Sequence, residues 1–164
     1  MEVDLNVVKE LRQKTGAGVM AVKKALDESN GDADKAEEIL KKQGLANALK
    51  KSDRETSEGV VQSYIHAGNK IGSLVELKCE TDFVARTDDF VNLAKDLAMQ
   101  VAAMGPLFIS KDDEGADKVS DEEILMSQAF IKDPSLTIED MIKSMISKVG
   151  ENVNISRITK FDLS

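Results

Sequence analysis

The stretch from Ile71 to Arg86, IGSLVELKCETDFVAR, contains two kinds of patterning. From Ile71 to Cys79, alternate residues are apolar or small, and this period of two predicts a half-buried β-strand. The stretch continues as Thr81-Asp82-Phe83-Val84-Ala85-Arg86, and a helical period begins near Thr87. A Phe between an acid and a Val at such a junction is either a core plug or a protruding wedge. The patterning alone does not choose between them.

The segments on either side of this stretch predict a hairpin and a long helix. Val60–His66 is rich in β-formers, and Ala67-Gly68-Asn69 supplies a turn, so an antiparallel hairpin is expected. A helix should run from about Thr87 to Met104 and end at Gly105-Pro106. Its buried stripe is expected to comprise Phe90, Ala94, Leu97, Ala98 and Val101.

The carboxyl-terminal part predicts a further helix and a returning strand. Residues 110–123 are acidic and are expected to form a mobile surface loop, and a short helix is predicted over Asp121–Ala129. Thr137 and Asp140 resemble a capping box, and the apolar period after them predicts a helix that ends at Gly150. Alternation over 153–161 predicts the last strand. The expected fold class is α+β, with an antiparallel three-stranded sheet and helices packed on it.

The amino-terminal part predicts a separate helical module. Helices are expected over residues 4–14 and 19–29 and from Asp32 to a stop at Gly44, which together form a three-helix bundle of the ubiquitin-associated (UBA) type. Leu5, Val8 and Leu11 should share the buried face of the first helix. The polar run 52–58 marks a boundary. The predicted domains are therefore 1–52, the UBA-like module with a helical extension, and 56–164, an α+β core of the dimerisation type.

Composition narrows the possible functions. The chain has 164 residues with 22 basic and 30 acidic side chains, a formal net charge of −8, so nucleic acid is not expected as the main partner. A run of lysines at positions 41–54 leaves a ribosome-associated or RNA-binding role as a weaker alternative. There is one cysteine, no signal-like amino terminus and no apolar run long enough to cross a bilayer, so a cytoplasmic protein is expected.

No catalytic or metal-binding constellation is recognisable. His66 lies beside the predicted turn without a Cys or Ser partner, and the alternation places Cys79 on the buried face of its strand. Gly16-Ala17-Gly18 follows a helix and lacks the Lys of a phosphate loop. We therefore expect a binding protein that is not an enzyme and has no cofactor. Asp82 and Arg86 are one turn apart and are expected to pair.

Several segments, in order along nearly the whole chain, resemble translation elongation factor Ts. They are Val8-Lys9-Glu10-Leu11-Arg12, Thr15-Gly16-Ala17-Gly18, Lys23-Lys24-Ala25-Leu26, Tyr64-Ile65-His66, the run from Val75 to Arg86, and Gly150-Glu151-Asn152-Val153. The resemblance implies a guanine-nucleotide exchange factor that binds the GTPase elongation factor Tu, with no nucleic-acid or membrane partner, as a monomer or homodimer.

The resemblance also implies two sets of site residues. In the family, the Asp-Phe pair of the Thr-Asp-Phe-Val motif wedges into the partner's GTPase domain and disturbs the support of its magnesium ion. Here the motif is Thr81, Asp82, Phe83 and Val84, and we expect Phe83 to be partly exposed in the free protein. A secondary contact through the amino-terminal module is expected to involve Arg12, Gly16, Gly18, Met20 and Lys23.

Two departures from the family pattern matter. Ala21-Val22 stands where the family has Asp-Cys, so a polar contact by that Asp is absent, and the region from Ser110 to Ile131 is short. The main alternative is an adaptor that uses the UBA-like module to bind other proteins, which leaves the second half of the chain unexplained.

Overall fold

The computed structural model describes residues 4–164, and the contacts within it divide the chain into two compact units. One unit contains the chain up to Arg54 together with Lys143–Asn152, and the other contains Glu55–Ile142 and Val153–Ser164. Grouping 143–152 with the amino-terminal helices differs from the predicted domain ranges, whose first residues, 1–3, lie outside the described part. The first unit has 13 basic and 11 acidic residues and the second has 9 and 19, so the negative charge resides in the second.

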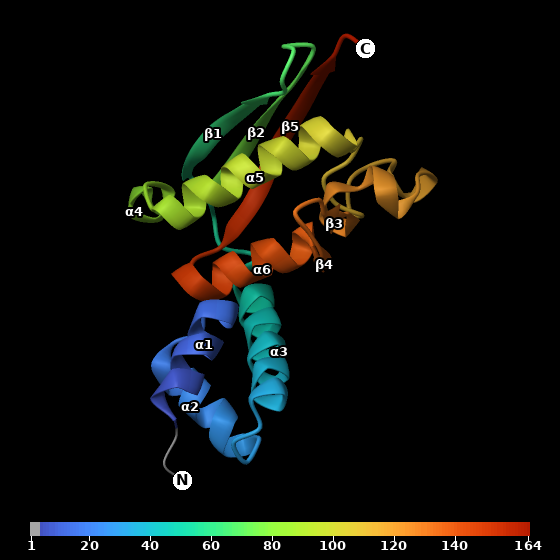
Figure 1. Ribbon diagram of the computed structural model, residues 1–164. Helices are drawn as coiled ribbons and strands as arrows, with labels where there is room; N and C mark the ends of the chain where they lie inside the picture. The colour runs from blue at the N-terminus through green and yellow to red at the C-terminus, as the bar shows by residue number, and fades with distance from the viewer. Residues whose placement is uncertain (1–3) are drawn as a thin grey trace. The chain divides into compact units, whose positions relative to one another are not determined.

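The first unit contains three amino-terminal helices: α1 (Leu5–Thr15), α2 (Val19–Glu28) and α3 (Ala33–Lys51) (Figure 1). Asp4 and Asp32 cap α1 and α3 by accepting hydrogen bonds from Asn6 N and Lys35 N. These helices match the predicted UBA-like module. Their core comprises Val8, Leu11, Val22, Ala25, Leu26, Ala36 and Leu40.

The predicted burial of Leu5 was wrong, because its side chain is 76% exposed. Val8 and Leu11 are buried as expected. At about 100° per residue, positions 5 and 11 lie about 120° apart around a helix axis. Residues spaced three apart therefore do not stay on one face of a helix, and within two turns they no longer all face the core.

The predicted stop at Gly44 was also wrong, because α3 continues through it to Lys51. Gly44 is buried, and a Cβ atom at this position would lie 3.3 Å from the Ser147 hydroxyl oxygen. The missing side chain therefore leaves room for the segment that contains Ser147, in the same unit. Here the glycine is a point of close approach and not a helix end.

The second unit is built on an antiparallel sheet in the order β1 (Glu58–Ile65), β2 (Ile71–Cys79) and β5 (Val153–Asp162). The hairpin turn between β1 and β2 places Gly68 and Asn69 at positive φ. Helix α5 (Asp88–Met104) crosses one face of the sheet (Figure 1), and the Ser73 hydroxyl donates to Ala98 O at 2.5 Å. This arrangement confirms the predicted α+β class.

The rest of the second unit follows α5. Gly105, in the left-handed conformation, ends α5, and three short 3₁₀ turns follow at Ala116–Lys118, Asp121–Glu123 and Leu125–Ser127. Strands β3 (Ala129–Phe130) and β4 (Asp133–Thr137) form a small second sheet. The helix predicted over 121–129 was therefore wrong. The mobility predicted for 110–123 stays a prediction.

Helix α6 (Ile138–Val149) begins at the predicted box, and its residues from Lys143 onward are grouped with the first unit. Thr137 N donates to Asp140 Oδ2 at 2.9 Å, and Asp140 N donates to Thr137 Oγ1 at 3.1 Å. Gly150, at φ 75°, follows the helix as expected.

A buried amide network explains why residues 121–131 form separate 3₁₀ turns and a short strand instead of one continuous α-helix. The Gln100 side chain, fully buried on α5, donates to Gln128 Oε1 at 3.1 Å and to Ala129 O at 3.0 Å, and its Oε1 accepts from Ile131 N at 3.0 Å. Gln128 Nε2 in turn donates to Glu122 O at 2.7 Å. These bonds fasten the segment to α5 and outweigh its weak helical period.

Replacing Gln100 with Leu should lower the free energy of unfolding by about 2–4 kcal/mol, because it leaves several buried polar groups without partners. Urea denaturation followed by circular dichroism measures the loss. Asn92→Leu, on the exposed side of the same helix, serves as the control and should change stability by less than about 0.5 kcal/mol. Equal effects of the two substitutions would contradict a structural role for the network.

Candidate partner-binding site

The Thr81–Arg86 motif forms a sharp corner between β2 and α5. Thr81 is the N-cap of the one-turn helix α4 (Asp82–Ala85), and its hydroxyl accepts from Val84 N at 3.4 Å. The thiol of Cys79, fully buried at the end of β2 as predicted, donates to Thr81 O at 3.1 Å. The corner is thus tied to the central strand of the sheet.

The other side of the corner is fixed by the start of α5. The Thr87 hydroxyl donates to Val84 O at 2.8 Å and also accepts from Phe90 N at 3.4 Å, which makes Thr87 the N-cap of α5. Ala85 and Phe90 are buried. The short helix is therefore held between two buried anchors, and little freedom remains for its backbone.

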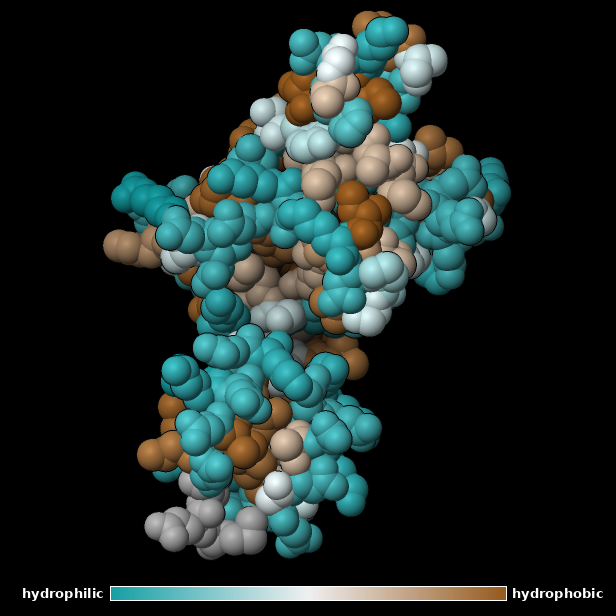
Figure 2. All heavy atoms as spheres, in the orientation of Figure 1, coloured by the Kyte–Doolittle hydropathy of each residue, from teal (hydrophilic) through white to brown (hydrophobic). Residues whose placement is uncertain are grey.

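Phe83 projects from this corner into solvent, with 78% of its surface exposed. The core-plug alternative is therefore excluded, and the expectation of an exposed Phe83 is confirmed. Thr81, Asp82 and Val84 are half-buried around it. Figure 1 shows α4 at the end of α5, and in Figure 2 pale brown atoms project at the same corner beside hydrophilic atoms.

The predicted ion pair beside Phe83 is present. Arg86 Nη2 lies 2.9 Å from Asp82 Oδ2, one helical turn along α4. Arg86 is largely exposed and Asp82 is half-buried, so the pair contributes at most a few tenths of a kcal/mol to stability. Its main effect is to orient the Asp82 carboxylate next to the exposed ring.

The predicted secondary contact lies in the first unit, around the turn between α1 and α2. Gly16, at φ 68°, ends α1 by donating its N–H to Arg12 O at 2.9 Å. Gly18 is the exposed N-cap of α2, and a Cβ atom there would meet no other atom within 4 Å. Arg12, Met20 and Lys23 are also exposed. The structure therefore leaves Arg12, Gly18, Met20 and Lys23 accessible within their own unit. Gly16 is half-buried, and a Cβ atom there would lie 3.0 Å from the Lys148 Cβ atom.

The substituted positions 21 and 22 have different environments. Val22 is fully buried in the helical core, so an apolar side chain suits it. Ala21 is half-buried and offers no polar group to a partner. Only the replacement at position 21 changes the chemistry of the exposed surface.

Residues 4–164 contain neither a candidate metal site nor a candidate membrane-spanning helix. No group of three or more His, Cys, Asp or Glu side chains within this range could hold a metal ion. His66 is exposed, as predicted, and its Nδ1 lies 3.1 Å from the Tyr64 hydroxyl. None of the helices in this range is long and apolar enough to cross a membrane.

Sequence reasoning missed an apolar surface on the sheet face opposite α5. Val61, Ile65, Leu74 and Phe161 are exposed there, and Ile65 and Phe161 are the two register partners of Gly72. Alternation along the hairpin could have identified Val61, Ile65 and Leu74. It would have placed Phe161 on the buried face with Val153 and Ile155. The reason is that the register irregularity between Glu76 and Leu77, which shifts the later part of β5 to the other face, is not visible in the sequence. Arg157 donates a hydrogen bond to Glu76 at 2.8 Å on this face, and this bond holds the pKa of the Glu76 carboxyl below its ordinary value.

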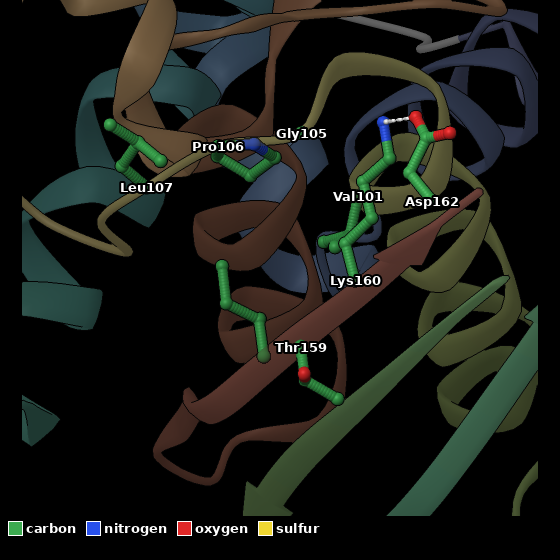
Figure 3. Close-up of a pocket in the computed structure, with 8 residues that line it drawn as sticks. Val101, Gly105, Pro106, Leu107, Thr159, Lys160 and Asp162 are labelled. Carbon is green, nitrogen blue, oxygen red and sulfur yellow. Dashed lines mark ion pairs between the residues drawn. The ribbon is translucent and has the colours of Figure 1, made fainter. Parts of the chain in front are cut away.

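A shallow groove of about 520 Å³ lies between the end of α5 and β5 in the second unit (Figure 3). Lys160 and Asp162 form an ion pair of 3.4 Å along its rim. The Ser164 hydroxyl donates to Asp162 and keeps the pKa of that carboxyl below its usual value. The lining residues are Val101, Gly105, Pro106, Leu107, Ile158, Thr159, Lys160 and Asp162.

The two phenylalanines of the corner should respond in opposite ways to truncation. Phe83→Ala should change the free energy of unfolding by less than about 0.5 kcal/mol, because the ring is already in water. Phe90→Ala should lower it by about 3–5 kcal/mol, because this ring is fully buried. Chemical denaturation of both variants tests this contrast, and a large loss from Phe83→Ala would mean that the ring packs in the core.

Comparison with known proteins identifies the family. The family model described as Elongation factor TS matches residues 5–130. Elongation factor Ts of Methylacidiphilum infernorum is 46% identical over 191 aligned positions, covering 98% of this chain and 95% of that protein. Those of Fervidobacterium nodosum and Thermotoga maritima are 43% and 40% identical, with 99% of this chain and 99% and 97% of the relatives covered. The chain therefore belongs to the elongation factor Ts family of translation elongation factors.

Proposed function

We propose that this chain is a guanine-nucleotide exchange factor that binds elongation factor Tu and promotes release of GDP. The observation that carries the proposal is the exposed Phe83 at a corner whose backbone is anchored on both sides. The proposal needs no cofactor or catalytic group on this chain, which acts as a binding protein in the cytoplasm and not as an enzyme. Neither nucleic acid nor membrane is a partner in this scheme.

In the proposed mechanism Asp82 and Phe83 enter the GTPase domain of elongation factor Tu. The ring leaves water for an apolar cleft, which stabilises the complex by about 1.5–3 kcal/mol. The Asp82 carboxylate enters with it, and the helices that support the magnesium ion are displaced. GDP then loses part of its binding energy.

GDP and this chain both bind elongation factor Tu, and thermodynamic linkage relates their two affinities. If this chain weakens the binding of GDP, then bound GDP must weaken the binding of this chain by the same fold-change. Burial of one Phe side chain changes an affinity by about tenfold to hundredfold, which limits the coupling that Phe83 alone can supply. A larger coupling requires further contacts, and the exposed residues around the α1–α2 turn are the proposed second set.

Phe83→Ala should lower the rate of GDP release at a fixed factor concentration by at least about tenfold, because the variant lacks the ring that enters the GTPase domain. Stopped-flow fluorescence with labelled GDP on elongation factor Tu measures it. Leu107→Ala removes an exposed apolar side chain elsewhere in the same unit and is the matched control. If a folded Phe83→Ala variant exchanges GDP as fast as the unsubstituted chain, the wedge mechanism is wrong.

Reversing the charge of Lys23 should weaken association with elongation factor Tu several-fold while leaving the fold intact, because Lys23 is exposed on α2. Titration calorimetry of the Lys23→Glu variant measures the affinity. Lys42→Glu makes the same charge change at an exposed position on α3. Equal losses in both variants would indicate a general electrostatic effect and remove Lys23 from the proposed contact.

A further inference from the structure

Met20 is unusually accessible for a methionine. It lies in the first turn of α2 and is 77% exposed, whereas Met104 is 47% exposed and Met145 is buried. The other methionines in the described part of the chain, Met99, Met126 and Met141, are half-buried. Oxidation of a thioether requires access of the oxidant to sulfur, so Met20 should react first.

Met20 lies on the side of α2 that faces away from the helical core, so its oxidation should not affect the stability of the fold. The opposite side of α2 supplies Val22, Ala25 and Leu26 to the helical core, and these side chains contain no sulfur. Lys23 lies one turn from Met20 on the exposed side. A change at the Met20 sulfur therefore alters the surface of the helix and leaves the core intact.

We propose that Met20 is a peroxide-sensitive modification site and that its sulfoxide weakens the binding of elongation factor Tu. The inference rests on the proposed function, because it places Met20 in the secondary contact. The thioether sulfur attacks one oxygen of hydrogen peroxide, an S–O bond forms and the O–O bond breaks. Sulfur is oxidised by two electrons, and the second oxygen is reduced and leaves as water after proton transfer.

The expected loss of affinity follows from desolvation. A methionine side chain adapts to an apolar surface, whereas a sulfoxide carries a polar oxygen that must lose its water when the contact closes. Without a new hydrogen-bond donor across the interface, binding should weaken by about tenfold.

The experiment oxidises the full chain with graded hydrogen peroxide and removes the oxidant with catalase before untreated elongation factor Tu is added. Peptide mapping by mass spectrometry should show oxygen added at Met20 before Met104. Titration calorimetry should show about tenfold weaker binding, with an unchanged circular dichroism spectrum. Methionine sulfoxide reductase should restore the affinity.

Two variants separate Met20 from other oxidation sites. Each is compared with its own untreated form, so any effect of the substitution on affinity cancels. The Met20→Leu variant should show the same affinity before and after peroxide. The Met104→Leu variant should bind like the unsubstituted chain and lose affinity on oxidation to the same extent.

Three results would overturn the inference: Met20 reacting no faster than Met104, undiminished binding by protein oxidised at Met20, or an equal loss in the Met20→Leu variant. If the untreated chain does not bind elongation factor Tu at all, the proposed function fails, and the effect on binding fails with it. In that case the peptide map still decides whether Met20 is the preferred oxidation site. A failure of the inference alone leaves binding by the untreated chain intact.

Discussion

The packing of α5 against one face of the three-stranded sheet is the interaction on which the second unit depends. Helix α5 contacts the central strand β2, and the core residues of these two elements are buried: Phe90 and Leu97 on the helix, Val75 and Leu77 on the strand. Because both partners are regular elements, the short connection between them has fixed end points. Helix α4 therefore has a defined direction, and the exposure of Phe83 follows from the packing behind it.

An exposed Phe on a constrained backbone has a thermodynamic advantage for binding. Most of the conformational entropy of the corner is lost when the chain folds and is not lost again at the interface. The ring has only two side-chain torsions to fix on association. The caps formed by Thr81 and Thr87 provide this constraint.

Much of this unit could be predicted from the sequence because the relevant signals are local. Alternation from Ile71 to Cys79 identified β2, and Thr87 and Gly105 marked the ends of α5. The reciprocal cap of Thr137 and Asp140 was also visible. The exposure of Phe83 was an expectation that needed the structure to decide it, because a Phe has the same local pattern inside a core or outside it.

The error at Leu5 came from local helical geometry, whereas two other errors came from contacts between residues that are distant in sequence. Gly44 looked like a helix end, but its environment is set by Ser147, about a hundred residues later. The segment around Gln128 looked helical, but its conformation is determined by hydrogen bonds to Gln100. Neither partner can be found from a local window. Within the corner itself no such distant contact is needed, and the predicted Asp82–Arg86 pair is present.

The uneven division of charge between the two units has a consequence for colloidal behaviour. The unit with nine basic and nineteen acidic residues also carries Phe83, Phe161 and the other exposed side chains of the open sheet face. Like charge opposes the approach of two such surfaces over a Debye length, about 8 Å at physiological ionic strength. A partner with a basic surface experiences attraction instead. The acidic surface thus keeps apolar side chains available in water while disfavouring encounters between copies of the chain.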